Sequence, residues 1–218
     1  MKTHFVLPYK EEDICYKHAL EAFLDPFREY LNKNLENYEI IIVEQMTGPT
    51  RNGKTLFNLG RNINIGFDIF SKDMKDDDIF IFHPVDIIPL DTDYKINKTT
   101  KFCSKTYHEF YYKAVGFPVS VYKQVNGFSN KIWGWGQEDD EMFKRWELQN
   151  IQFDTVTNNY KELLPNSLLH DQCLLIENTA FVRELVQAQT CMISGLNDLK
   201  YKILNTLDYN GVKRHQIS

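Results

Sequence analysis

The chain contains few cysteines, no surplus of basic residues and no long apolar run. Its four cysteines lie far apart and form no C-x-x-C pair, which favours reduced thiols over a disulfide framework or a zinc site. The formal net charge is −5 at pH 7, so the chain lacks the positive charge with which proteins generally bind nucleic acids. We therefore expect no nucleic-acid partner.

No segment is long and apolar enough to cross a membrane, which takes about 18 residues or more. The most apolar segment, residues 79–90, is interrupted by a histidine, an aspartate and two prolines. The amino terminus has only a three-residue apolar stretch at 5–7, which does not resemble a signal peptide. We therefore expect no integral membrane segment and a cytoplasmic location.

The 218 residues are 43% hydrophobic and 25% charged, as in an ordinary folded domain, and the length fits one such domain. Strand-like segments at 5–9, 38–43 and 79–82 alternate with helical patterns at 14–31 and 63–70. The proline inside the first helical pattern predicts either a kink or the start of a second helix. The alternation predicts an α/β fold with a mixed, mostly parallel central sheet and helices on both faces.

The later part of the chain is less regular. Residues 91–117 show no clear period. The segments expected after them are a strand or short helix at 119–125, a glycine- and tryptophan-rich loop at 127–136, helices at about 138–150 and 179–188, and a compact segment at 194–209.

Residues Gly48 to Thr55 match the pattern of a phosphate-binding P-loop, G-x-x-x-x-G-K-[ST]. In a P-loop, Lys54 and Thr55 would contact the terminal phosphates and magnesium of a nucleotide. However, four residues separate the preceding strand from Gly48, whereas a P-loop strand leads almost directly into the first glycine. A surface loop is one interpretation, and a P-loop nucleotide kinase or NTPase is the alternative.

A carboxylate follows the third predicted strand. Asp86 lies just beyond residues 79–83, where open α/β sheets bind their ligands, and is therefore a candidate ligand for a divalent metal. Two other acidic strings, at 76–78 and 91–93, are interpreted as exposed turns. His170 is a weaker candidate, because a lone histidine is more often structural than a metal ligand.

The loop Trp133 to Gly136 alternates two tryptophans with two glycines, and one residue later come three carboxylates: Glu138, Asp139 and Asp140. Such a loop suits a lid that closes an apolar wall over a sugar ring. Acidic residues at a helix amino terminus also stabilise the helix through its dipole, by about 0.3–1 kcal/mol each. A carboxylate that stays ionised there is a candidate general base toward a hydroxyl nucleophile.

Five motifs occur in one order along the chain: Phe57-Asn58, Asn64 to Phe67, Ile81 to Pro89, Asn126 to Asn130, and Trp133 to Glu141. Together they resemble the beta-1,4-galactosyltransferase family, and the last motif is the most specific. The segment at 195–201 is similar to the galactosyltransferases that extend xylose. The resemblance implies a GT-A nucleotide-diphosphosugar transferase fold in a single domain, residues 1–218. Its nucleotide-sugar-binding half would span about 1–90, and its acceptor-binding and catalytic half about 91–218.

The resemblance also implies roles for individual residues. Asp139 matches the catalytic base, and Trp135 matches the tryptophan that contacts the donor sugar and the acceptor. Glu138 and Asp140 match residues that hold sugar hydroxyls. The residues at nucleotide-binding positions are Pro8, Tyr9, Lys10, Phe57, Asn58 and Val85.

Asp86 and His170 match the metal ligands of the family, so the implied cofactor is manganese or magnesium. Three positions depart from the family pattern. Pro84 replaces an aspartate, Leu59 replaces an arginine and Leu168 replaces a second histidine. The nearby cations of residues 61 and 54 are candidate replacements for the missing arginine.

We therefore predict a metal-dependent, inverting glycosyltransferase that moves a hexose, galactose or N-acetylgalactosamine, from a UDP-sugar to a glycan hydroxyl. The expected partners are a UDP-sugar donor and a glycan or glycoconjugate acceptor. Because three family positions are substituted, a non-catalytic sugar-binding relative is a further alternative.

Overall fold

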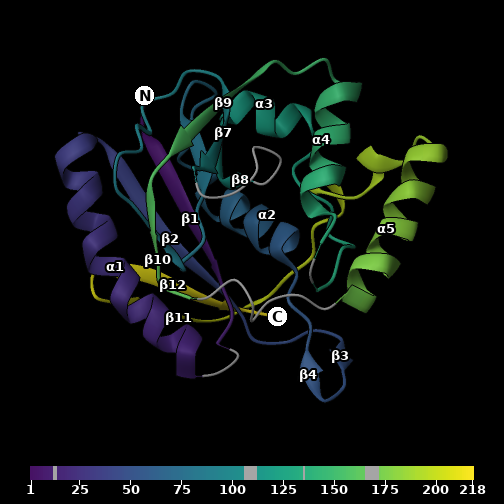
Figure 1. The fold of residues 1–218 in the computed structure, drawn as a ribbon, viewed down its shortest axis with the longest axis horizontal. Coiled ribbons are helices and arrows are strands. Elements are labelled where there is room, and N and C mark those ends of the chain that lie inside the picture. Colours follow the sequence, from purple (N-terminus) through teal and green to yellow (C-terminus); the bar gives the residue numbers. More distant parts are fainter. Residues whose placement is uncertain (12–13, 106–111, 135, 165–171) are drawn as a thin grey trace.

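The computed structural model describes residues 1–11, 14–105, 112–134, 136–164 and 172–218. An eight-stranded sheet forms its centre (Figure 1). The strands of this sheet are β1 (Thr3–Tyr9), β2 (Tyr38–Gln45), β5 (Ile79–Phe82), β7 (Thr99–Ser104), β8 (Tyr112–Pro118), β9 (Phe153–Asn158), β11 (Ile203–Tyr209) and β12 (Val212–Ile217).

The order of strands across the sheet is β11-β12-β2-β1-β5-β8-β7-β9. Four neighbouring pairs are parallel, namely β12–β2, β2–β1, β1–β5 and β7–β9, and the other three are antiparallel. The predicted mixed, mostly parallel sheet is therefore confirmed. The central strands are apolar on both faces; Val6 of β1, for example, lies in register between Ile41 and Phe82 and is fully buried. Such strands are typical of a sheet covered on both sides.

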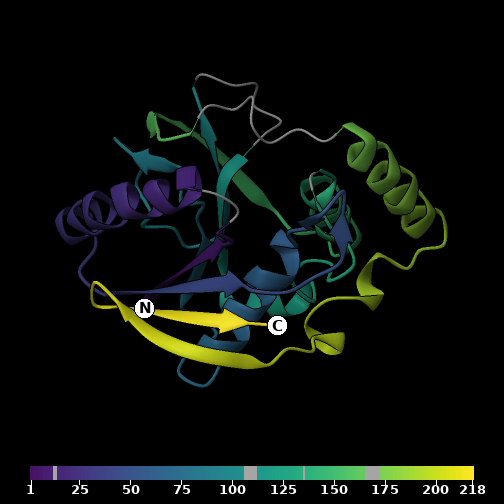
Figure 2. The ribbon, with the colours of Figure 1, turned by 90° about the horizontal axis from the view of Figure 1, so that it is seen from below.

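Helices cover both faces, as predicted (Figures 1 and 2). α1 (Ile14–Asn34) packs on one face, and α2 (Leu59–Phe70), α3 (Val119–Gln124) and α4 (Glu138–Leu148) pack on the other. α5 (Gln172–Gln187) lies outside α4. α1 continues through Pro26, so the proline starts no second helix. Pro26 is exposed, where water can satisfy the backbone carbonyl that loses its partner.

The remaining elements are short. They are β3 (Thr50–Arg51), β4 (Lys54–Thr55), β6 (Ile87–Pro89), β10 (Tyr160–Glu162) and two 3₁₀ turns, Cys191–Ile193 and Leu196–Asp198. β3 pairs with β4, and β6 pairs with β10. Across the described ranges, we find no helix whose length and apolar character would allow it to span a membrane.

The less regular part of the chain differs from the predictions in several places. Residues 119–124 form a helix, which decides between the two alternatives there. Two strands, β7 and β8, lie in the region that showed no period, and α5 begins seven residues earlier than predicted. The compact segment predicted for 194–209 is wrong, because its second half is β11, which forms an antiparallel hairpin with β12.

Candidate functional site

The carboxyl ends of β1, β2 and β5 meet at one edge of the sheet because these strands are parallel. β1 ends at Tyr9, and both Pro8 and Tyr9 are buried. Lys10 follows, and its Nζ donates a hydrogen bond of 2.5 Å to the carbonyl of Thr55. Val85, just beyond β5, is buried in the core on the α1 face. These predicted nucleotide-binding residues thus lie at the edge where open α/β sheets bind ligands.

Phe57 and Asn58 immediately precede α2. The Asn58 side chain caps this helix by accepting a hydrogen bond of 2.8 Å from the N–H of Arg61, and it donates one of 2.8 Å to the carbonyl of Asn130. The carbonyl of half-buried Phe57 accepts the N–H of Gly134 at 2.7 Å. These bonds join the first predicted half of the chain to the tryptophan loop of the second, while direct nucleotide contact by Phe57 and Asn58 stays a prediction.

The loop before α4 is held on two sides. On one side Gly48 packs so closely that a Cβ atom there would lie 2.8 Å from the ring of Trp133. On the other side, the Asn178 side chain in α5 donates to the carbonyls of Trp133 and Gly136, at 3.2 and 3.1 Å. Gly136 has a φ of 98°, a conformation that favours glycine. Trp135, the predicted sugar contact, lies outside the described residues.

The three predicted carboxylates occupy the first turn of α4, and their surroundings differ. Asp140 is exposed and accepts a hydrogen bond of 2.8 Å from Gln137 Nε2. Asp139 is half-buried. Glu138 is partly exposed as a residue, but its Oε2 atom is buried and has no hydrogen-bond partner among the described residues. This burial, with a contribution from the charge of Asp140, raises the pKa of Glu138 to about 7.

A fourth acidic residue, Glu141, has a structural role that the sequence reasoning missed. Its carboxylate is fully buried and accepts hydrogen bonds of 2.8 and 2.9 Å from Arg145 Nε. Arg145 also donates to the carbonyls of Gly127 and Ser194, at 2.7 and 2.6 Å. The pair therefore fixes α4 against the neighbouring loops. The signal for it was a Glu–Arg spacing of four residues on one helix face.

Asp86 lies in the turn between β5 and β6, where the sequence predicted it. Its carbonyl accepts the N–H of Leu163 at 2.7 Å, and the pairing of β6 with β10 brings Glu162 close by. Burial raises the pKa of Asp86; the field of Lys113 opposes this effect and that of Glu162 adds to it. A positive charge beside Asp86 would therefore favour its ionised form.

Within the described ranges, no three or more His, Cys, Asp and Glu side chains form a group that could hold a metal ion. His170, the second predicted ligand, falls in 165–171, outside those ranges, and so does Leu168. Pro84, which replaces an aspartate, offers only a carbonyl, and that oxygen accepts a hydrogen bond of 2.7 Å from Nδ1 of His83. Of the two predicted metal ligands, Asp86 and His170, the structure describes Asp86.

The P-loop interpretation of residues 48–55 is wrong. Residues 50–55 form the β3–β4 hairpin, with Asn52 and Gly53 at its turn, both at positive φ (52° and 76°). These values match the two-residue hairpin turn that Asn-Gly favours. In a P-loop a helix begins at the Gly-Lys-Thr sequence, whereas here Lys54 lies in a strand and α2 begins only at Leu59.

Arg61 does not substitute for the arginine that Leu59 replaces. Its Nη2 donates to the carbonyls of Lys200 and Ser218, at 2.7 and 2.9 Å, so it binds the end of the chain. Lys54 is exposed and remains the candidate replacement.

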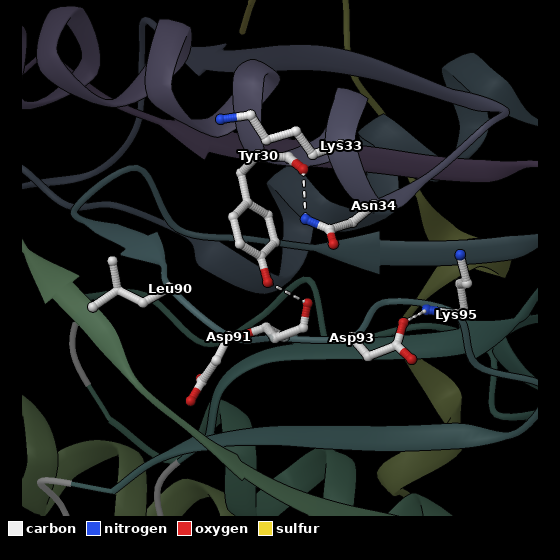
Figure 3. A pocket seen from close by; sticks show the side chains of 8 residues that line it. Tyr30, Lys33, Asn34, Leu90, Asp91, Asp93 and Lys95 are labelled. Atoms are coloured by element: carbon white, nitrogen blue, oxygen red, sulfur yellow. Dashed lines mark hydrogen bonds between the residues drawn. The ribbon is translucent and has the colours of Figure 1, made fainter.

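Only part of the predictions for the two acidic strings is confirmed. Asp91 and Asp93 are exposed, but Asp78 is buried and accepts the N–H groups of Lys2 and Lys75, at 2.6 and 2.9 Å. The 91–93 string lines an open hollow of about 610 Å³ between α1 and the segment after β6 (Figure 3).

Several polar groups of this hollow bond to one another. Tyr30 donates from its hydroxyl to the carbonyl of Thr92 at 2.7 Å, and the N–H of Lys95 donates to Asp93 at 2.9 Å (Figure 3). Among the predicted site residues that the structure describes, none lines the hollow.

Comparison with known proteins gives two family matches. A model described as the N-terminal region of glycosyl transferase group 7 matches residues 1–98, and one described as the N-terminal domain of galactosyltransferase matches 98–166. Mouse beta-1,4-galactosyltransferase 1 is 28% identical over 95% of this chain and 52% of its own length. Human beta-1,4-galactosyltransferase 5 is 29% identical, over 92% and 51%. The chain thus spans about half the length of the curated relatives it matches.

Two solved structures share the fold. The catalytic domain of Drosophila beta-1,4-galactosyltransferase 7 in complex with xylobiose matches with a TM-score of 0.77 and 23% identity, covering 100% of this chain and 92% of that one. A mutant of the Drosophila enzyme in complex with manganese, UDP-Gal and xylobiose matches with a TM-score of 0.75 and 22% identity, over 100% and 93%. This similarity confirms the GT-A fold predicted from the sequence.

Proposed function

The chain belongs to the beta-1,4-galactosyltransferase family, and we propose that it is a metal-dependent, inverting glycosyltransferase. It would transfer galactose or N-acetylgalactosamine from a UDP-sugar to a hydroxyl of a glycan. The observation that supports this most directly is the 2.7 Å bond between Gly134 N–H and the Phe57 carbonyl. It holds the predicted nucleotide-binding segment against the loop that leads into Glu138, Asp139 and Asp140.

The known relatives support the choice of substrates. The solved Drosophila complex contains UDP-Gal and manganese together with xylobiose, a disaccharide. By analogy, the donor of this chain would be a UDP-hexose and its acceptor a glycan. The segment at 195–201, which is similar to the galactosyltransferases that extend xylose, supports an acceptor of the same kind.

The chemistry of Asp86 fits a divalent cation. Manganese and magnesium prefer oxygen ligands, and Asp86 offers a carboxylate. Burial disfavours the ionised form of this carboxylate, and a neighbouring positive charge would stabilise it. Asp86 would hold the ion with the diphosphate of the donor, and His170 is the further predicted ligand. When bound, the metal supplies Lewis-acid stabilisation of the charge that develops on the leaving diphosphate.

The remaining chemistry belongs to residues at the start of α4. Asp139 would take the proton of the acceptor hydroxyl while that oxygen attacks the anomeric carbon from the face opposite UDP. The new C–O bond forms as the bond to the diphosphate oxygen breaks, so UDP leaves with the bonding electrons and the anomeric configuration inverts. Glu138 and Asp140 would hold sugar hydroxyls. Closure of the Trp135 loop would exclude water and so limit hydrolysis.

The experiment that tests this proposal measures UDP release from a panel of UDP-sugars, with candidate glycan acceptors, in manganese or in EDTA. We expect the wild type to release UDP from one donor only when manganese is present. Asp139→Asn should lose about 100-fold or more of this rate, because it removes the general base. Asp77→Asn, which removes an exposed aspartate from the turn before β5, is the matched control and should keep the wild-type rate.

Two results would contradict the proposal. If Asp139→Asn released UDP as fast as the wild type, Asp139 would not be the base. If the wild type bound UDP but released none from any donor, the chain would be a non-catalytic sugar-binding relative, which the substitutions at Pro84, Leu59 and Leu168 also favour.

A further inference from the structure

The carboxyl-terminal hairpin brings a buried arginine to the donor edge of the sheet. β12 lies parallel to β2 (Figure 2). The register aligns Tyr9 of β1 with Glu44 of β2, and Glu44 with Gln216 of β12. Arg214 lies two residues before Gln216, so its side chain points to the same face of the sheet. Tyr9, Glu44 and Arg214 are 2%, 3% and 9% exposed.

Arg214 is held firmly in this position. Its Nε donates to Glu44 Oε2 at 2.8 Å and its Nη2 donates to Glu44 Oε1, so the pair is bidentate. Gln216 Nε2 donates to the same carboxylate at 2.9 Å. A second carboxylate, that of Glu11 just beyond β1, lies 3.4 Å from Arg214 Nη2. The guanidinium is thus fixed by neighbouring strands and cannot swing into solvent.

The fixed guanidinium packs on an aromatic side chain of the proposed donor site. Its Cζ atom lies 5.0 Å from the ring centre of Tyr9 and 5.4 Å from that of Tyr209, distances typical of cation–π contacts. Tyr9 is the last residue of β1, and Lys10 follows it directly. The orientation of the Tyr9 ring therefore depends on a residue from the other end of the chain.

We propose that Arg214 is a positioning residue for the nucleotide part of the donor: it fixes the Tyr9 ring at the end of β1. This inference rests on the proposed function, in which the donor binds beyond that strand. Glu138, Asp139 and Asp140 lie on α4, which packs on the other face of the sheet. Loss of Arg214 should therefore weaken donor binding and leave the chemical step unchanged.

The test uses Arg214→Met, which keeps the length of the side chain but removes its charge. We expect the KM for the UDP-sugar and the Kd for UDP, measured with manganese, to rise about tenfold, as for loss of a buried contact at a binding site. The kcat should stay within about twofold. Arg214→Lys should give a smaller rise in KM, because lysine keeps the charge but not the planar fork. Lys213→Met, which removes an exposed cation from the neighbouring position, is the matched control.

A second variant separates positioning from stability. Arg214→Met leaves the Glu44 carboxylate buried without its cation, whereas the double variant with Glu44→Gln has no carboxylate there. We expect the double variant to regain the melting temperature but to keep the raised KM, because the Tyr9 ring is still unsupported. If the KM returned to the wild-type value together with the melting temperature, Arg214 would act only as a counter-charge and the inference would be overturned.

The outcomes also distinguish this inference from the proposed function. A wild type that uses a UDP-sugar, with an Arg214→Met variant of unchanged KM, would overturn the inference alone. A wild type that neither binds UDP nor releases it from any donor would overturn both. If Arg214→Met failed to fold, the lysine variant and the double variant would decide the question by the same measurements.

Discussion

The buried carboxyl of Glu138 makes the stability of the protein depend on pH near neutrality. Burial, with a contribution from the charge of Asp140, raises the pKa of Glu138 from 4.5 to about 7. The folded protein therefore keeps a proton that the unfolded chain releases at lower pH. The contribution of this group to stability is complete below about pH 4.5 and is lost as the pH rises through about 7.

The magnitude follows from the same two values. The difference between a pKa of 4.5 and one of about 7 corresponds to about 3 kcal/mol, at about 1.4 kcal/mol for each pKa unit. This figure is an upper limit, because part of the Glu138 side chain is exposed and solvent screens its charge. Glutamine keeps the shape of the side chain but has no charge, so Glu138→Gln should remove the pH-dependent loss.

Urea unfolding of the wild type and of Glu138→Gln between about pH 4 and 8 measures the effect. Near pH 4 the two free energies of unfolding should agree, and toward pH 8 the variant should become more stable by up to about 3 kcal/mol. Glu147→Gln, which removes an exposed carboxylate from the same helix, is the matched control. If the difference between Glu138→Gln and the wild type were the same at every pH, the argument from burial would be refuted.

Two further substitutions test the packing around the site. Arg145→Met leaves the Glu141 carboxylate buried without its cation and should cost about 3–5 kcal/mol of unfolding free energy, partly recovered by adding Glu141→Gln; a loss below about 1 kcal/mol in urea unfolding would contradict this. Gly66→Ala places a Cβ atom 2.1 Å from Val6 Cγ2 and should lower stability by about 1–3 kcal/mol. Adding Val6→Ala should relieve the clash, so a double variant no better than the sum of the two single losses would count against it.

The sequence predicted the elements whose apolar pattern is complete within one short segment. Residues 79–82 are apolar at every position, which requires burial on both faces, and they form the central strand β5. In α4 the apolar residues Met142 and Trp146 are buried, and Phe143 is half-buried. Both patterns are complete within one element, so no knowledge of the rest of the fold is needed to interpret them.

The strands that the sequence analysis missed are defined by their pairing with other strands. β7 alternates polar and apolar residues only weakly, and it is stabilised between β8 and β9. β11 is exposed along most of its length and is defined by its pairing with β12. A local pattern cannot reveal such strands, because most of the energy of a strand comes from its cross-strand neighbours.

The P-loop match failed for a different reason, since the better signal was present in the same eight residues. Asn52-Gly53 is the dipeptide that the tight two-residue hairpin turn prefers, because both of its positions need positive φ. A phosphate-binding loop depends on a helix that starts directly at Lys54, and the residues from 56 to 58 do not begin one. Structural context, and not the match itself, distinguishes the two interpretations.

The two sides of the proposed site also differ in how the sequence encodes them. The acceptor side consists of a loop and a helix that follow each other directly, so one continuous motif at 133–141 predicted it. The donor side joins β1 to β12, and the bond from Arg214 to Glu44 spans 170 residues. Pairing over that distance forms only when the whole sheet folds. A substitution near the carboxyl terminus is therefore expected to act on the residues that follow β1, although nothing near it in the sequence indicates a binding site.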